Sequence, residues 1–83
     1  MSVYIDNMNA PYRGMKMCHM VADDINELHE MANKIGLKRS WFQDGSSHPH
    51  YDICLSKKQL AISFGAKAIT VMELGRKFLR RTK

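Results

Sequence analysis

The segment HPHYDICLSKK, residues 48–58, concentrates side chains that can do chemistry. It carries two imidazoles, a phenol, a carboxylate, a thiol and two ammonium groups, which belong to His48, His50, Tyr51, Asp52, Cys54, Lys57 and Lys58. Groups of this kind bind metal ions, transfer protons or hold anionic ligands. The spacing of these residues, together with the rest of the chain, ranks the three possibilities.

A metal site is the first possibility. His48 and His50 would share one face of an extended segment, and Cys54 follows four residues later; imidazole and thiolate both bind zinc. The chain, however, has no Cys-x-x-Cys pair and no second histidine pair at ligand spacing. Cys18 and His19 are sequence neighbours, so on a strand they would point to opposite faces. From the sequence we therefore predict no metal ion and no other cofactor.

The joint at Ser56-Lys57-Lys58, where a predicted strand meets a predicted helix, favours an anion. A helix N-terminus binds phosphate through its free N–H groups and its positive dipole end, and the two lysines add charge. Ligands in open α/β sheets usually lie at the carboxyl ends of strands, and the strand before this joint brings His50 and Tyr51 to the same edge. The alternative is an ordinary helix start with solvated lysines.

Further cationic and aromatic residues could reach the same edge. Arg13 lies in the turn after the first strand, and Arg39 with Trp41 offers a guanidinium and an aromatic face, which suit a phosphate and a base. Trp41 could instead belong to the core. In the binding hypothesis Ser56 and Lys57 hold the phosphate. The predicted ligand-binding residues are Tyr12, Arg13, His19, Arg39, Trp41, His50, Tyr51, Ser56, Lys57 and Lys58.

Metal-dependent phosphodiester hydrolysis is an alternative function. Asp6, directly after the predicted strand SVYI, resembles the opening carboxylate of nucleases of the PIN and NYN type. Such enzymes gather several carboxylates around divalent metal ions, and this alternative would use Asp6, His19, His50 and Asp52. Because the chain offers few other carboxylates, we expect a binding protein rather than an enzyme.

The positive charge is confined to the C-terminal end. The chain has 13 basic and 8 acidic residues, a net charge of +5, and up to Gly75 the two kinds are equal in number. Such a tail could bind nucleic acid without reading its sequence, or it could be a solvated terminal helix. The surplus comprises Arg76, Lys77, Arg80, Arg81 and Lys83.

Length and composition predict one soluble domain over residues 1–83. Hydrophobic residues make up 45% of the 83 residues and charged residues 25%, which is ordinary for a globular chain. No apolar run approaches the roughly 18 residues of a membrane span, and no signal peptide is evident, so we expect a cytosolic protein with reduced Cys18 and Cys54. A chain this short encloses little volume, so we expect a homo-oligomer.

The hydrophobic pattern predicts a small α/β fold with three to four strands and two to three helices, with α+β as the alternative. Strands are predicted at 2–5, 15–22, 50–55 and 67–72, and helices at 24–35, 56–64 and 73–83. The order strand, helix, strand in the second half is the usual source of a parallel pair. Asp24 with Glu27 and Ser56 with Gln59 have the spacing of capping boxes.

Several motifs in a fixed order resemble a small family of bacterial and phage proteins, domain of unknown function 4031. They are VYIDN, APYRGMKMCHMVAD, ELHEMANKIG, RSWFQ, HYDICLSKK and FGA, from Val3 to Ala66. The family places Gly before Arg after the Pro-Tyr pair, whereas here Arg13 precedes Gly14. The resemblance implies that the shared positions are Tyr12, Met17, His19, His29, Trp41, Gln43, His50, Tyr51 and Asp52.

The resemblance implies no established activity. Several of its shared positions are polar or aromatic residues predicted to lie in loops, which indicates a binding site as well as a core. Small phage proteins often act by binding. One such role is the sequestration of a host nucleotide signal, in evasion of host immunity, within a pocket between identical subunits.

Overall fold

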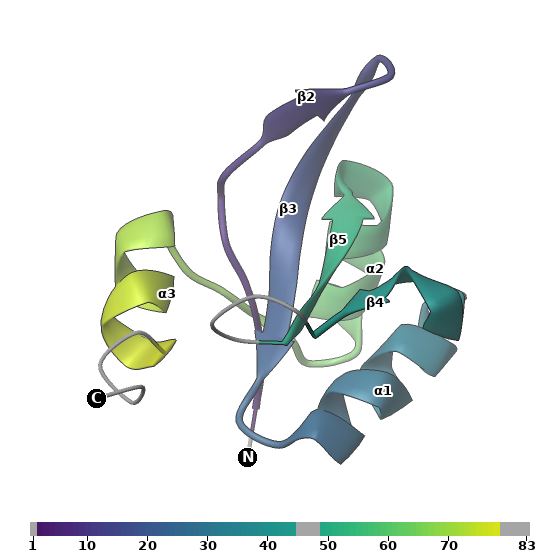
Figure 1. Cartoon of the computed structure of the whole chain (residues 1–83), viewed down its shortest axis with the longest axis vertical. Coiled ribbons are helices and arrows are strands. Elements are labelled where there is room, and N and C mark those ends of the chain that lie inside the picture. The colour runs from purple at the N-terminus through teal and green to yellow at the C-terminus, as the bar shows by residue number, and fades with distance from the viewer. Residues whose placement is uncertain (1, 45–48, 79–83) are drawn as a thin grey trace.

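Six β-strands and three α-helices form in the part of the chain that the computed structural model describes, residues 2–44 and 49–78 (Figure 1). A small sheet with helices is thus confirmed, and the α+β alternative describes it. The sheet exceeds the predicted three to four strands because short strands, β2 and β4, form in two segments predicted as loops. The elements are β1 (Val3–Ile5), β2 (Ala10–Tyr12), β3 (Met15–Ala22), α1 (Ile25–Lys34), the 3-10 helix η1 (Arg39–Trp41), β4 (Phe42–Gln43), β5 (His50–Cys54), α2 (Leu55–Ser63), β6 (Lys67–Ala68) and α3 (Val71–Phe78).

The strand order is β4-β5-β3-β1-β6, and β2 pairs with β3. Only β1 and β6 pair in parallel; the other pairs are antiparallel. The parallel pair predicted for the second half does not form between β5 and β6, because β3 and β1 lie between these two strands. At eight residues β3 is long enough to pair with β1, β2 and β5, and it therefore occupies the centre of the sheet.

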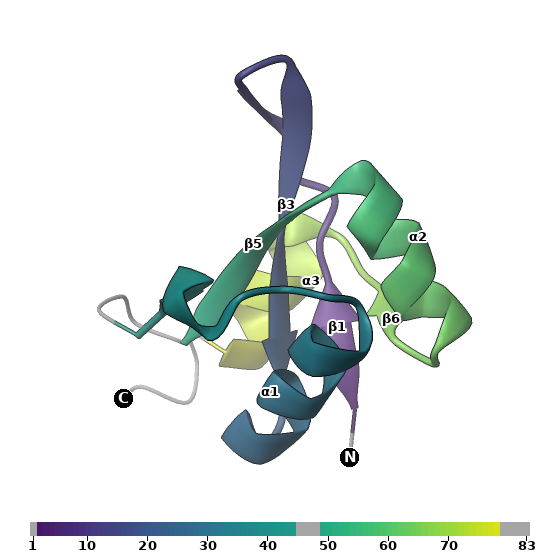
Figure 2. The same cartoon turned by 90° about the vertical axis from the view of Figure 1, so that its right-hand side faces the viewer.

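The two faces of the sheet carry different residues, because successive side chains of a strand point to opposite sides. Helices α1 and α2 cover one face and α3 lies on the other (Figures 1 and 2). Under α3, Leu74 packs with Val21 in a small second cluster, joined by Tyr4 and Ile69. The main core under α1 and α2 consists of Val3, Ile5, Cys18, Met20, Leu28, Met31, Ala32, Ile35, Leu37, Tyr51, Ile53, Ala61 and Ala66.

Helix α3 begins two residues earlier than predicted and replaces the end of the predicted strand 67–72. Thr70 and Glu73 form a reciprocal capping box: Thr70 N donates to Glu73 Oε1 at 2.9 Å, and Glu73 N donates to Thr70 Oγ1 at 3.1 Å. Asn7 Oδ1 also accepts a bond from Val71 N at 3.0 Å. These bonds end β6 at Ala68. None of the helices in the described ranges is long and apolar enough to cross a membrane.

The two predicted capping boxes at α1 and α2 do not form. Asp24 is the N-cap of α1, and Cys54, not Ser56, is the N-cap of α2; neither makes a side-chain capping bond. The neighbouring Asp23 carboxylate instead accepts bonds from the Ser2 N–H and the Tyr4 hydroxyl, both at 3.2 Å. Asp23 thus joins the start of β1 to the end of β3.

Candidate functional site

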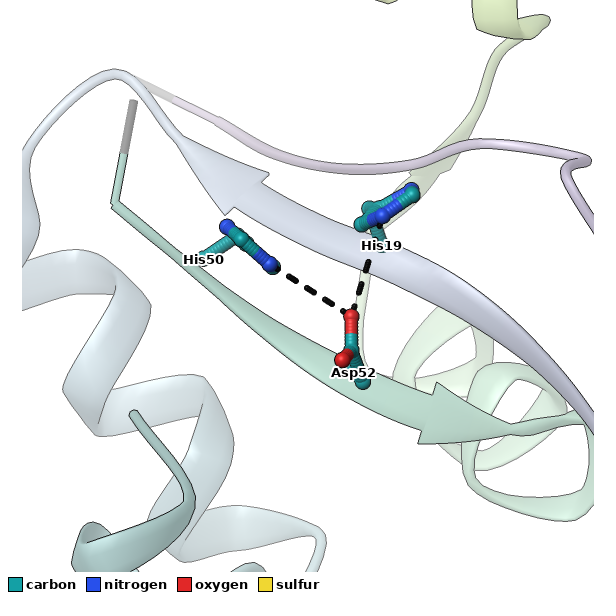
Figure 3. A group of neighbouring side chains, drawn as sticks. All are labelled: His19, His50 and Asp52. Carbon is teal, nitrogen blue, oxygen red and sulfur yellow. Dashed lines mark ion pairs between the residues drawn. The ribbon is translucent and has the colours of Figure 1, made fainter. Parts of the chain in front are cut away.

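Two histidines and an aspartate meet on the sheet face opposite the main core (Figure 3). His19 lies on β3 directly opposite Asp52 on β5, and His50 is two residues before Asp52, so the strand pairing puts all three on one face. Asp52 Oδ1 lies 3.8 Å from His19 Nε2 and 3.5 Å from His50 Nε2. The two imidazole rings meet edge to face, with 5.0 Å between centroids. We call these three residues the His–Asp cluster.

Two further residues hold the His–Asp cluster in place. Asp6, with only 1% of its surface exposed, lies with Oδ2 2.7 Å from His19 Nδ1. Its Oδ1 accepts bonds from the backbone N–H groups of His19, at 2.9 Å, and Met8, at 3.2 Å, which fix the carboxylate. On the other side, Gln43 Nε2 donates to Asp52 Oδ2 at 2.7 Å. Both His19 and Asp52 therefore have one polar atom bonded to a neighbour and the other directed into the cluster.

A cleft of about 920 Å³ borders the His–Asp cluster and is shared by several elements. The β2–β3 hairpin, which projects from the body of the molecule in both views (Figures 1 and 2), forms one wall. The segment around η1, the strand β5 and the first turn of α2 complete the wall. The lining residues are Ala10, Pro11, Tyr12, Arg13, Met15, Met17, His19, Leu37, Ser40, Trp41, Gln43, Asp52, Ile53, Cys54 and Lys57.

Half of the predicted ligand-binding residues line this cleft: Tyr12, Arg13, His19, Trp41 and Lys57. His50 lies beside the cleft in the His–Asp cluster and is mostly buried. Arg39 and Ser56 are exposed outside the cleft lining. Tyr51 belongs to the core, with 1% of its surface exposed, and does not offer a ring to a ligand.

The two lysines of the predicted phosphate joint are anchored to backbone carbonyls. Lys57 Nζ donates to Ile35 O at 2.7 Å, and Lys58 Nζ donates to Asp6 O at 3.0 Å. In the alternative of an ordinary helix start both lysines would be solvated, whereas here each ammonium group is bonded to a backbone carbonyl. Only Lys57 also lines the cleft. The two adjacent lysines thus connect α2 to opposite parts of the fold, Lys57 to the end of α1 and Lys58 to the end of β1.

His29, which the sequence marked as part of a shared pattern, supports the core behind β5. Its Nδ1 shares a 2.8 Å hydrogen bond with the Tyr51 hydroxyl, and its ring meets Phe42 edge to face at 4.6 Å. Desolvation first, and the nearby Arg39 charge second, lower the pKa of His29 from its usual 6.5. Desolvation raises the pKa of Tyr51, against a smaller opposing effect of Arg39.

The two cysteines differ in their surroundings. Cys18 is buried, and its Sγ lies 3.3 Å from Asn9 Oδ1 as a donor. Cys54 lines the cleft, and its Sγ lies 3.2 Å from Ser56 Oγ. The hydrogen bond with the Ser56 hydroxyl first, and the nearby backbone N–H of Lys57 second, lower the pKa of the Cys54 thiol.

The basic C-terminal residues are only partly described. Lys77 lies 3.7 Å from Asp23 Oδ1 and 4.7 Å from the centroid of the Tyr4 ring, so it contributes to packing α3 on the sheet. Arg76 is exposed. The other basic tail residues, and the His48 of the histidine pair, lie outside the described residues; the tail residues are Arg80, Arg81 and Lys83.

The full set of cleft residues cannot be predicted from the sequence, because it depends on the strand register. Met15, Met17 and His19 occupy alternate positions of β3, and Asp52 and Cys54 alternate on β5, so each strand carried a readable pattern. Which two patterns would face each other depends on the pairing of His19 with Asp52. Gln43 had a weak signal, as part of the shared Trp-Phe-Gln motif.

Comparison with protein families gives a match over most of the chain. The model of a family described as protein of unknown function (DUF4031) matches residues 3–81. The match extends into the basic tail, beyond the Val3–Ala66 region that the motifs indicated. No curated protein and no solved structure is significantly similar to the chain.

Proposed function

The chain belongs to the DUF4031 family, and we propose that this member binds a phosphate-bearing small molecule, such as a nucleotide or a nucleotide-derived signal. One observation carries the proposal: the cleft brings together two cations, Arg13 and Lys57, and two aromatic rings, Tyr12 and Trp41. Its volume of about 920 Å³ lies within the range of roughly 300–1,000 Å³ that is typical of small-molecule sites.

Lys57 is suited to hold a phosphate. An ammonium group has three N–H donors, and the bond to Ile35 O uses one of them. Two donors are left for an anionic ligand, on a group whose position is already fixed. Because less conformational freedom is then lost on binding, an anchored cation binds a ligand more tightly than a freely rotating one.

Tyr12 and Trp41 are suited to hold a base. Their exposed fractions are 53% and 48%, large values for aromatic side chains. Arg13 lies 5.4 Å from the Tyr12 ring centroid, and Lys38 lies 5.8 Å from that of Trp41, so each ring carries a cation beside it. Stacking of a base on such a ring contributes about 1–3 kcal/mol.

We propose that the protein binds its ligand without converting it, and that it does so in the cytosol. A protein that sequesters a nucleotide signal, as a phage protein evading host immunity would, needs an open site of this kind in the cytosol. The β2–β3 hairpin, which lines the cleft, projects from the body of the molecule (Figures 1 and 2), and we propose that a second copy of the chain covers the cleft at this hairpin. If light scattering finds only monomers at all concentrations, the proposed dimer is excluded.

Substitution of the two adjacent lysines tests the ligand site. Lys57→Gln removes the ammonium that lines the cleft, whereas Lys58→Gln removes the same charge one position away, outside the cleft. Since a hydrogen bond to a charged group contributes about 1.5–3 kcal/mol, Lys57→Gln should weaken nucleotide binding about 10- to 100-fold, and Lys58→Gln less than about twofold.

The measurement is a thermal-shift screen of nucleotides and cyclic nucleotides on the full chain, followed by calorimetric titration of the best ligand with both variants. Stabilisation should rise with ligand concentration. The proposal fails if none of these ligands raises the melting temperature, or if the two variants lose the same affinity.

Metal-dependent phosphodiester hydrolysis is the second candidate, because Asp6, His19, His50 and Asp52 do lie together beside the cleft. Asp6 bonds to the far nitrogen of His19, so it orients the cluster rather than joining it. Release of nitrophenol from a chromogenic phosphodiester decides this candidate: no turnover with added Zn²⁺ or Mn²⁺ would exclude it and leave the binding function untouched.

A further inference from the structure

We propose that the His–Asp cluster is a binding site for a divalent transition-metal ion, with His19 Nε2, His50 Nε2 and Asp52 Oδ1 as the ligands. No two of the ligand atoms are more than 4.8 Å apart. The distances from Asp52 Oδ1 to His19 Nε2 and to His50 Nε2 are 3.8 and 3.5 Å. Metal–ligand bonds of about 2.0–2.2 Å in a tetrahedral site require separations of roughly 3.3–3.5 Å. Small side-chain rotations would therefore bring all three atoms onto one ion.

The same distances are too long for direct hydrogen bonds. An N–H···O bond spans 2.7–3.2 Å, whereas both contacts of Asp52 Oδ1 with imidazole nitrogens exceed this range. The other contacts around the cluster are shorter, at 2.7 Å between Asp6 and His19 and 2.7 Å between Gln43 and Asp52. The cluster is thus held tightly at its outside and spaced more widely at its centre, as a site for a bridging atom requires.

The outer contacts orient the ligands in the way that metal sites use. A ligating histidine almost always bonds through its other ring nitrogen to a carboxylate or a carbonyl, which sets the tautomer. Asp6 serves this role, because it binds His19 Nδ1 and directs the lone pair of Nε2 into the cluster. Gln43 does the same for Asp52 by bonding to Oδ2 and leaving Oδ1 toward the centre.

The donor set selects the class of metal. Two imidazoles and one carboxylate suit Zn²⁺, Co²⁺ or Fe²⁺, whereas Mg²⁺ and Ca²⁺ prefer oxygen ligands. Three protein ligands leave at least one coordination position open. Because His19 and Asp52 also line the cleft, that position borders the volume assigned to the phosphate ligand. A phosphate oxygen could occupy it, and this last step rests on the proposed function.

Titration of the full chain with Zn²⁺ in reducing buffer, with no phosphate ligand present, tests the site apart from the proposed function. One equivalent should bind saturably, and Co²⁺ should give the intense visible bands of a four- or five-coordinate ion. Mg²⁺ should not compete. Absence of saturable one-to-one binding of both Zn²⁺ and Co²⁺ overturns the proposal.

Substitutions identify the ligands. His50→Gln and Asp52→Asn should each weaken Zn²⁺ binding by at least about 100-fold, more than the roughly 10- to 100-fold loss expected for an outer contact. His29→Gln is the matched control, because it removes an imidazole outside the cluster and should leave the affinity within about twofold. Cys54→Ser is the second control, since its thiol lies nearby on the same sheet face. If Cys54→Ser abolishes binding and His50→Gln does not, the assignment is wrong.

The outer contacts are tested with Gln43→Ala. Gln43 is exposed, so the variant should keep the circular dichroism spectrum and melting temperature of the parent while Zn²⁺ binds about 10-fold more weakly. Asp6→Asn should have an effect of the same direction. If Asp6→Asn does not fold, because Asp6 is buried, Gln43→Ala and His50→Gln still decide the question. An unchanged Zn²⁺ affinity in both Gln43→Ala and His50→Gln would contradict the proposed metal site.

Discussion

At the scale of single residues, the role of a side chain depends more on its environment than on its chemical type. His29 and His19 are both imidazoles on regular elements, yet one bonds to a core tyrosine and the other to a buried carboxylate. Tyr51 was predicted as a stacking ring and is instead a core residue whose hydroxyl needs the His29 partner. A buried hydroxyl normally finds a hydrogen bond, so the His29–Tyr51 pair is a structural unit behind β5 and not part of the cleft.

The His29–Tyr51 pair predicts a pH dependence of stability. Desolvation and Arg39 hold the folded pKa of His29 below the unfolded value of about 6.5, so the unfolded state binds the proton more readily. The contribution of a neutral His29 is therefore complete above pH 6.5 and is lost as the pH falls through the lower, folded pKa. Urea unfolding from pH 7.5 to 5 should show the free energy of unfolding falling with pH.

The variant His29→Gln isolates this effect from the other histidines. It should be less stable than the parent at pH 7.5, by about 1 kcal/mol for the lost hydrogen bond, and the difference should shrink as the pH is lowered. Parallel pH profiles for parent and variant would contradict the assignment. Arg39→Gln should raise the His29 pKa, as followed by NMR titration of its ring protons.

At the scale of elements, Lys57 connects the end of α1 to the start of α2. Gly36 follows α1 with a φ of +81°, and Lys57 Nζ lies 3.3 Å from where a Cβ at Gly36 would be. Gly36 ends α1 in the left-handed conformation that glycine favours after a helix: Gly36 N bonds to Asn33 O and Leu37 N to Ala32 O. The absence of a side chain at Gly36 therefore serves both the backbone turn and the lysine that crosses it.

Two glycine substitutions separate these effects. Gly14, in the β2–β3 turn, has nearly the same φ, +79°, but no atom within 4 Å of a built Cβ. Both Gly14→Ala and Gly36→Ala should cost about 1–2 kcal/mol for the left-handed backbone. Gly36→Ala should cost more, because Lys57 must move, and the excess should vanish in a Lys57→Gln background. Equal costs from urea titration of both variants would contradict the contact.

Two local features, the β2–β3 hairpin and the start of α3, were not predicted from the sequence. The turn at Arg13-Gly14 joins β2 to β3 with positive φ at both residues, +50° and +79°, a conformation that favours Asn-Gly or Gly-Gly over Arg-Gly. The pattern Thr70-x-x-Glu73 has the spacing of a capping box, which marks the start of a helix. Because the residues around it are apolar, a strand was predicted there instead. Local turn and cap chemistry was available in the sequence in both places.

At the scale of the whole molecule, the surplus positive charge lies at the C-terminal end of the sequence, and its two described residues, Arg76 and Lys77, do not line the cleft. Residues up to Gly75 balance eight basic against eight acidic side chains, and Lys77 is paired with Asp23 in the fold. Any binding to nucleic acid should therefore depend on the end of the chain, and ligand binding in the cleft should not.

A tail variant checks this separation. Replacing Arg80, Arg81 and Lys83 by Gln should remove weak binding to DNA, seen as loss of its steep salt dependence in fluorescence anisotropy. Nucleotide and Zn²⁺ affinities should stay within about twofold of the parent. A large loss of either would place the tail at the cleft and contradict the separation.

Features that depend on neighbouring residues were predictable from the amino-acid sequence alone. The strand at 15–22, the helices at 24–35 and 56–64, the glycine after α1, the neutral body and the family motifs follow from periodicity, cap chemistry and composition. All of these act over a few residues. Five cleft residues were also within reach, because cations and aromatics in loops are readable as such.

The strand order and the register, in contrast, were not predictable from local patterns and follow from the tertiary fold. Residues His19 and Asp52 belong to separate patterns that gain meaning when β3 pairs with β5, and Asp6 and Gln43 reach the cluster from two further strands. The two-residue alternation of side chains along a strand shows which residues share a face. It does not show which strand lies alongside, or at what offset. That choice depends on the competition of β1, β2 and β5 for the edges of β3, which no local pattern records. The His–Asp cluster is the consequence of that pairing.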